Sequence, residues 1–180
     1  MRLRRSLSLL CATALALAMP ALPATADTTT TTFTLTGGAL SISVPASKDL
    51  GSAATGASTL SSQLGTVTVT DDRGALLGSW TATVSSTDFT TGAATSNETI
   101  AKSSVTYWSG PATSTSGTAV RVPGQATSAN AQDLSTSRTA FSATGVVGNN
   151  ATAWNPTLTV NLPSTAVAGT YSGTVTHSVA

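Results

Sequence analysis

The chain has 180 residues, only 8% of them charged, and its eight Lys and Arg nearly balance its seven Asp and Glu. This balance leaves no basic patch, which excludes nucleic acid as a partner. One cysteine and one histidine exclude a disulfide framework and a zinc site built from these two residue types alone.

Residues 1–26 have the three parts of a secretory signal peptide. Three arginines lie within the first five residues, an uncharged apolar run spans residues 7–19, and Ala24-Thr25-Ala26 supplies small residues for cleavage before Asp27. The arginines at positions 4 and 5 leave the twin-arginine route open beside the general one. The apolar run is shorter than the ~20 residues of a membrane span. We therefore expect a secreted chain, extracellular or associated with the cell wall, without a transmembrane anchor.

Removing the leader leaves no cysteine, and five basic residues against seven acidic ones, a net charge of −2. Residues 27–32 are mostly threonine and are interpreted as a flexible lead-in. We place a single domain at 33–180, stabilised by its core. Apolar residues recur there at every second position, the period of a strand with one face against a core. Strands are predicted at 40–44, 67–69, 80–84, 158–162 and 171–179, with weaker ones at 103–108, 119–122 and 139–144.

Turn signals separate these strands and decide the fold class. They lie at 37–38, 71–74, 109–111, 123–124 and 148–150. With seven to nine short strands and no convincing helix, the pattern predicts an all-β fold. We expect an antiparallel β-sandwich of immunoglobulin-like or jelly-roll type.

His177 has no recognisable catalytic setting. The chain after the leader has no thiol and no Gly-x-Ser-x-Gly stretch. Strand parity places His177 on one face with Tyr171, Val175 and Val179. We interpret it as a half-buried or strand-end histidine.

The acidic residues do not define a site. The stretch Asp71-Asp72-Arg73-Gly74 has adjacent carboxylates that suit calcium, but it lacks further spaced acids, and its spacing of Asp and Gly favours a hairpin turn. The other acids are single, so no glycosidase pair is identifiable, although a pair formed in space stays open. We predict no catalytic residue, no metal site and no cofactor.

Tyr107-Trp108 is an aromatic pair on a predicted strand. Because neighbours on a strand point to opposite faces, one ring is expected in the core and the other on the outside. An exposed ring suits stacking on a sugar, and is also common without function. Both interpretations stay open.

Two segments resemble the WxL domain of bacterial cell-wall-associated surface proteins. The first is LGTVTVTDDRGALLGSWTATV, residues 64–84, and the second is NPTLTVNLPSTAVAGTYSGTVTHSV, residues 155–179. In that family a Val-Thr-Asp-x-Arg-Gly turn precedes the first Trp-x-Leu, and a Gly-Thr-Tyr-x-Gly-Thr-Val-Thr strand leads into the second. Order and spacing are similar from about residue 40 to residue 179.

The two tripeptides differ from the family pattern. Trp80-Thr81-Ala82 keeps the tryptophan and loses the leucine, whereas His177-Ser178-Val179 replaces both. The resemblance implies a secreted β-sandwich held non-covalently on the cell wall, with both motifs close together. It implies peptidoglycan binding through Trp80, Thr81, Ala82, His177, Ser178 and Val179.

Three functions are compatible with these features. The first is a non-enzymatic surface protein that binds peptidoglycan or another cell-surface glycan, with other surface proteins as further partners. The alternative is an adhesin-like or carbohydrate-binding sandwich that recognises an external glycan or host surface through Tyr107, Trp108 or Trp154. The third is a hydrolase that uses dispersed carboxylates.

Overall fold

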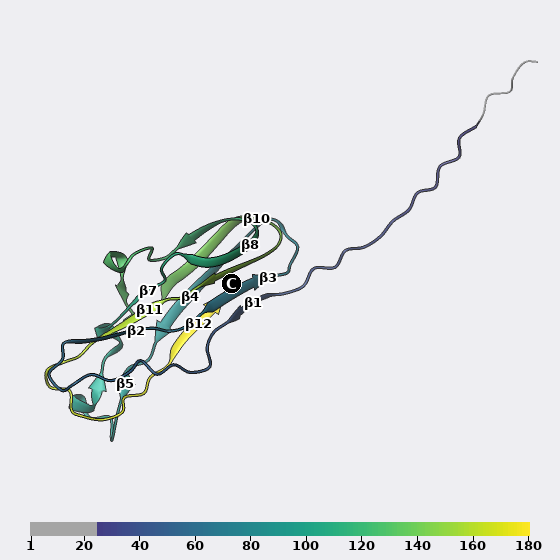
Figure 1. Ribbon diagram of the computed structural model, residues 1–180. Helices are drawn as coiled ribbons and strands as arrows, with labels where there is room; N and C mark the ends of the chain where they lie inside the picture. The colour runs from purple at the N-terminus through teal and green to yellow at the C-terminus, as the bar shows by residue number, and fades with distance from the viewer. Residues whose placement is uncertain (1–24) are drawn as a thin grey trace, which may run out of the picture. The chain divides into compact units, whose positions relative to one another are not determined.

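The computed structural model describes residues 25–180 (Figure 1). Residues 1–24, which hold most of the predicted signal peptide, lie outside the described residues. The chain divides into two units between Thr34 and Leu35. Residues 25–34, which include the predicted lead-in, have no helix or strand, and their side chains are exposed. The second unit, Leu35–Ala180, contains every strand of the described chain.

The second unit is almost entirely β-structure, which confirms the predicted all-β class. The described residues contain twelve strands instead of seven to nine, and three short 3-10 turns at Ser96–Glu98, Lys102–Ser104 and Ser128–Asn130. Every predicted strand segment contains observed strand residues, whereas β2, β5, β6 and β9 were not predicted. The strands are β1 Leu40–Ser43, β2 Thr59–Gln63, β3 Val67–Asp71, β4 Leu76–Ser86, β5 Phe89–Thr90, β6 Thr99–Ile100, β7 Val105–Trp108, β8 Ala112–Pro123, β9 Gln132–Asp133, β10 Arg138–Trp154, β11 Thr157–Asn161 and β12 Val175–Val179.

The strands form two main antiparallel sheets that enclose the core. The larger sheet has the order β1-β3-β10-β4-β12, with β8 also paired to β10, and the smaller one has the order β2-β11-β7-β9. A two-stranded sheet, β5-β6, is separate from both. Tyr107 of the smaller sheet contacts His177 and Trp154 of the larger sheet, so the sheets pack face to face as in a sandwich. The strand β1 also approaches β12 without pairing with it, so the larger sheet nearly closes.

Alternation of residue types determines which side chains enter the core. In β3, Val67 and Val69 are buried, while Thr68 and Thr70, which alternate with them, are half-buried. In β4, Trp80, Ala82 and Val84 are buried on the same principle. Threonine and serine therefore cover the outside of the sheets, which accounts for the unusual composition.

Strand β10 bends sharply within its seventeen residues. Phe141 and Trp154 are thirteen residues apart, roughly 40 Å in a straight strand, yet their ring centroids are 5.0 Å apart. The bend coincides with Gly145 and Gly148, both at positive φ, where a side chain is strained. The predicted turn at 148–150 is thus a bend inside one strand, not a loop between two strands.

The stretch 71–74 is predicted to be a hairpin turn, which would pair the two strands on either side of it, and this prediction is wrong. Strands β3 and β4 do not pair with each other. Instead β4 pairs with the first half of β10 and β3 with the second half, both antiparallel. Residues 72–75 follow the bend of β10, so the local turn chemistry was recognised but the tertiary partner was not.

Arg121 of β8 ties the bend together. Strand β8 pairs with β10 on both sides of its bend. The Arg121 guanidinium donates to Thr152 Oγ1 at 2.7 Å, to the carbonyls of Ala119 and Gly117 at 3.2 Å each, and to the carbonyl of Ser116. These carbonyls belong to the irregular part of β8, where regular ladder bonds are interrupted. The planar guanidinium presents several donors in a fixed arrangement, which suits simultaneous bonds to these carbonyls and to Thr152.

Candidate functional site

The two WxL-like tripeptides lie on neighbouring paired strands. Ala82 of β4 is opposite Val179 of β12, and Val84 is opposite His177. Trp80 lies four residues from Val84 along β4, roughly 13 Å away. The predicted proximity of the two motifs is therefore found for their last residues, whereas Trp80 and His177 make separate contacts.

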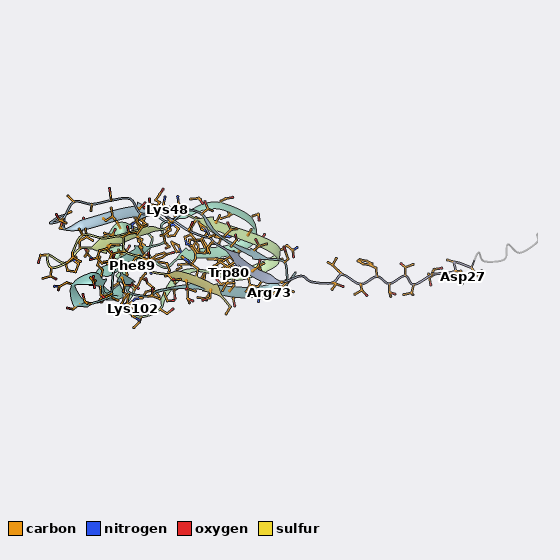
Figure 2. The ribbon with its side chains drawn as sticks, turned by 90° about the horizontal axis from the view of Figure 1, so that it is seen from below. Asp27, Lys48, Arg73, Trp80, Phe89 and Lys102 are labelled. Carbon is orange, nitrogen blue, oxygen red and sulfur yellow. The ribbon has the colours of Figure 1, made fainter. Side chains whose placement is uncertain are left out.

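Strand parity divides the six motif positions between the two faces of the sheet. Trp80 and Ala82 are 2% and 0% exposed, and Figure 2 shows Trp80 among the packed side chains. This corrects the expectation that their side chains contact a ligand, because both point into the core. His177 and Val179 are half-buried on the same inner side, whereas Thr81 and Ser178 are exposed on the outer side.

The outer side of β4 and β12 is a row of hydroxyl groups. Ser178 Oγ lies 3.2 Å from Thr83 Oγ1 across the pair, and either hydroxyl can donate. Thr81 and Thr176 continue this row and are exposed. Hydroxyls both donate and accept hydrogen bonds. We call Thr81, Thr83, Thr176 and Ser178 the hydroxyl face.

Trp80 belongs to a polar cluster at the bend of β10. Its Nε1 donates to Asn150 Oδ1 at 3.3 Å. Next to Asn150 in the ladder, Asp71 has a fully buried side chain that accepts two bonds from Arg73, at 2.8 and 2.9 Å. The Arg73 guanidinium lowers the pKa of Asp71, against the opposing effect of burial. In Figure 2, Arg73 and Trp80 lie toward one end of the unit.

His177 belongs to a second polar cluster, between the sheets. Trp154 Nε1 donates to Tyr107 Oη at 3.1 Å, and Tyr107 Oη lies 3.1 Å from His177 Nε2. Because indole can only donate, Tyr107 accepts from Trp154 and has its own proton free for His177 Nε2. This network assigns the neutral histidine proton to Nδ1. Within the described residues, Nδ1 has no hydrogen-bond partner.

The imidazole is neutral at physiological pH. Burial lowers the pKa of His177 to about 4, and burial also raises the pKa of Tyr107. The ring centroids of Tyr107 and His177 are 5.6 Å apart, and those of Trp154 and His177 are 6.5 Å apart. The sequence predicted a half-buried strand histidine, which is what the structure shows. Its aromatic partners were missed, because they come from strands of both sheets.

The aromatic pair of β7 follows the predicted parity. Tyr107 is 0% exposed, whereas Trp108 is half-buried on the outer side of the smaller sheet. Trp154 is also 0% exposed. The expectation that a sugar stacks directly on Tyr107 or Trp154 is therefore wrong, because both rings are buried. Of these three side chains, only Trp108 presents part of its ring to the outside.

An open groove of about 970 Å³ lies beside His177. Its walls are residues 44–57 and 163–174, which run at the same end of the unit in Figure 1. Its floor consists of apolar side chains from both main sheets, from the β5-β6 sheet and from the segment between β2 and β3. Lys48 and Asp49 are the charged residues in its lining. The floor residues are Leu60, Leu64, Val67, Phe89, Ile100, Leu158 and Val160.

Several carboxylates are engaged in local hydrogen bonds. The pKa of Asp133 is lowered to about 2, first by the Ser135 hydroxyl, then by the Ser135 amide and also by Arg138. The pKa of Glu98 is lowered by Thr95. Asp49 accepts from the Gly51 amide and Asp88 from the Lys102 amide. Within residues 25–180, no cluster of three His, Cys, Asp or Glu forms a metal site.

Comparison with known proteins assigns no family to this arrangement. No helix of residues 25–180 has the length and apolar character needed to cross a membrane. No protein-family model, no curated protein and no solved structure matches the chain. The similarity to the WxL domain is therefore a resemblance of sequence motifs, and function has to be argued from the hydroxyl face, the two polar clusters and the groove.

Proposed function

We propose that the chain is a secreted, non-enzymatic surface protein that associates non-covalently with cell-wall peptidoglycan through the hydroxyl face. The observation that carries this proposal is the pairing of the two WxL-like tripeptides, with Ala82 opposite Val179. This pairing puts Thr81 and Ser178 on one exposed side of adjacent strands. The carboxylates that a hydrolase would need are mostly used in local hydrogen bonds, which favours binding over hydrolysis.

A hydroxyl face suits a repeating polar polymer. Each hydroxyl offers one donor and two acceptor positions to sugar hydroxyl and amide groups. Single bonds of this kind contribute little net free energy in water. A long glycan that presents many equivalent groups compensates through a high local concentration. We therefore expect weak binding to short sugars and stable retention on intact wall.

Co-sedimentation with isolated peptidoglycan tests the proposal. Residues 27–180 contain the whole compact unit and are expected in the pellet. The double variant Thr81→Val with Ser178→Ala removes two hydroxyls and is expected to lose at least half of this retention. A loss of binding with unchanged thermal unfolding supports the hydroxyl face as the site.

A matched control lies on the same sheet. Ser41 and Thr70 are paired across β1 and β3, as Ser178 and Thr83 are paired across β12 and β4. The double variant Thr70→Val with Ser41→Ala should sediment like the parent chain. Equal losses in both variants, or a parent chain that stays in the supernatant, would contradict the proposal.

The half-buried Trp108 supports a second candidate function, recognition of an external glycan. Its ring is partly exposed on the outer side of the smaller sheet, and Gly110 leaves room beside it: a Cβ there would lie 3.3 Å from the ring. Aromatic rings of this kind provide apolar stacking surface. A glycan array with the parent chain and Trp108→Ala distinguishes this function, because binding to a non-wall glycan that depends on Trp108 is expected only from it.

A further inference from the structure

Exposed apolar side chains gather on three neighbouring strands of the larger sheet. The described residues have nine large apolar side chains that are exposed, and five of them lie on β4, β8 and β10, with exposed fractions from 45% to 79%. Single exposed apolar residues are common, whereas a group of them is typical of a binding surface. The five are Leu76, Leu77, Val120, Val122 and Val147.

The strand register places two of the valines beside the hydroxyl face. Ser142 of β10 is opposite Val122 of β8 on one side and opposite Thr81 of β4 on the other. Residues directly opposite in a sheet have their side chains on the same face, roughly 5 Å apart. Val122, Ser142 and Thr81 therefore form one row across three strands, and Thr81 belongs to the hydroxyl face. One row closer to the bend of β10, Val120 is opposite the exposed Thr144.

A third row lies at the bend itself. Val147 of β10 is opposite Thr118 of β8 on one side and opposite Leu76 of β4 on the other. Thr118 is two residues from Val120 along β8, so the two side chains share one side of the strand. The apolar residues of the three rows therefore form a continuous border along the outer side of the sheet. We call Leu76, Val120, Val122 and Val147 the apolar strip.

Strand β4 has a strained residue next to the apolar strip. Residues 76–78 of β4 are opposite only two residues of β10, Val146 and Val147, which makes a β-bulge. Leu77 has a φ of +60°, a conformation that is strained for a bulky side chain. The bulge leaves both Leu76 and Leu77 exposed. Strained backbone is concentrated at functional sites, so the exposed leucines favour a binding role for this part of the sheet.

The apolar strip and the hydroxyl face together match the chemistry of an N-acetylated sugar. Neither surface contains a charged side chain. An acetamido group has an N–H, a carbonyl and a methyl group. Hydroxyls can bond to the first two, whereas the methyl group gains free energy by leaving water against an apolar side chain. A sugar with hydroxyl groups alone would leave the apolar strip in contact with water.

We propose that the apolar strip binds the methyl groups of N-acetyl substituents on a glycan strand, while the hydroxyls of Ser142 and Thr81 bond to the polar atoms of the same substituents. This inference rests on the proposed binding of peptidoglycan and names the group that is recognised. The site then extends from β12 and β4 across β10 to β8, and it distinguishes N-acetylated glycans from unsubstituted ones.

Two forms of one wall polymer that differ by a methyl group test this preference. Peptidoglycan is de-N-acetylated and then acylated again with either acetyl or formyl groups, which are both neutral. Residues 27–180 are expected to sediment with the re-acetylated polymer as they do with untreated peptidoglycan. Binding to the formylated polymer should be roughly fourfold weaker, the effect of one buried methyl group per contact.

Variants of the apolar strip show which residues recognise the methyl group. Val120→Thr with Val122→Thr keeps the β-branched shape and replaces two exposed methyl groups by hydroxyls. This variant should bind the acetylated polymer roughly tenfold more weakly and no longer distinguish acetyl from formyl. The matched control is Val44→Thr with Val167→Thr, since both valines are 42% exposed and neither lies in a strand. The control should bind like the parent chain, and thermal unfolding checks that both variants fold.

The outcomes separate this inference from the proposed function. A parent chain that binds the acetylated and formylated polymers equally would overturn the inference alone, as would a Val120→Thr/Val122→Thr variant that still distinguishes them. A parent chain that stays in the supernatant with every polymer would contradict the proposed function and this inference with it. If the parent chain dimerises without polymer and the variant does not, the apolar strip binds a second copy and the inference is likewise overturned.

Discussion

The two polar clusters of this protein use tryptophan in the same way and differ in what surrounds them. At the bend of β10, Trp80 donates to Asn150 beside the Asp71–Arg73 ion pair. Between the sheets, Trp154 donates to Tyr107, which bonds to His177 at the open groove. The first cluster holds the bend of β10. The second cluster ends in the His177 ring, whose Nδ1 has no hydrogen-bond partner among the described residues. The same kind of tryptophan hydrogen bond therefore lies beside a buried ion pair in one cluster and leads to a half-buried imidazole at the groove in the other.

Removing either indole should have the largest effect. Trp80→Ala and Trp154→Ala each leave a large cavity and an unpaired polar partner, so each should lower the free energy of unfolding by about 3–5 kcal/mol. Urea denaturation measures both. The comparison between the clusters would break if one variant lost less than about 1 kcal/mol, because that indole would then contribute little to packing.

Arg121 should matter more than its partial exposure suggests. Arg121→Ala leaves the carbonyls of Ser116 and Gly117 without these donors and should cost about 2–3 kcal/mol. Arg121→Lys should recover only part, since an ammonium group cannot reproduce the planar fork. The exposed Lys102→Ala is the control, expected within about 0.5 kcal/mol of the parent in the same denaturation experiment.

The stability contributed by the cluster around His177 should depend on pH in a range where that of the cluster around Trp80 does not. The pKa of His177 is lowered to about 4 from an ordinary value of 6.5. The unfolded chain therefore binds a proton that the folded chain excludes between these values, so stability falls as pH falls through this window. The loss is expected to be about 2 kcal/mol.

Unfolding measured between pH 4.5 and 7.5 isolates this effect. In that interval Asp71 and Asp133 stay ionised, since their pKa values are lowered. His177→Phe should flatten the dependence. A parent chain whose stability is already flat would show that the ring is well solvated.

Gly117 and Gly148 test how tightly the backbone is packed at the bend of β10. A Cβ at Gly117 would lie 2.3 Å from the Asn149 carbonyl oxygen, whereas a Cβ at Gly148 meets no atom within 4 Å. Both have φ of +68°. Gly148→Ala should cost about 1 kcal/mol from backbone strain, and Gly117→Ala about 1–2 kcal/mol more from the clash. Equal melting temperatures for the two variants would place the constraint elsewhere.

The sequence predicted the local β-structure because it depends on neighbours in the chain. The alternation around Val67 and Val69 was sufficient to predict β3 and its buried face. Parity also separated Tyr107 from Trp108. The same parity grouped Trp80 with Ala82 and Val84, a signal of burial that the resemblance to a binding motif outweighed.

The remainder depends on which strands meet. Gly148 indicated a change of direction in the chain, but no local pattern predicts that strand β10 continues through this glycine and pairs with both β3 and β4. The partners of His177 lie 70 and 23 positions away in the chain and come from opposite sheets. The groove is likewise formed by segments far apart in the chain, residues 44–57 and the stretch before β12, which no single strand encodes.

The bend of β10 also sets the order in which the chain can fold. Strands β3 and β4 acquire their principal partner only from residues 138–154, far along the chain. Until that segment has left the ribosome, the first half of the domain has exposed strand edges and no partner for them. Pairing over such separations is slow and prone to aggregation. Folding should therefore wait for nearly the whole chain and then proceed in one late step, with β10 as the template on which the earlier strands assemble.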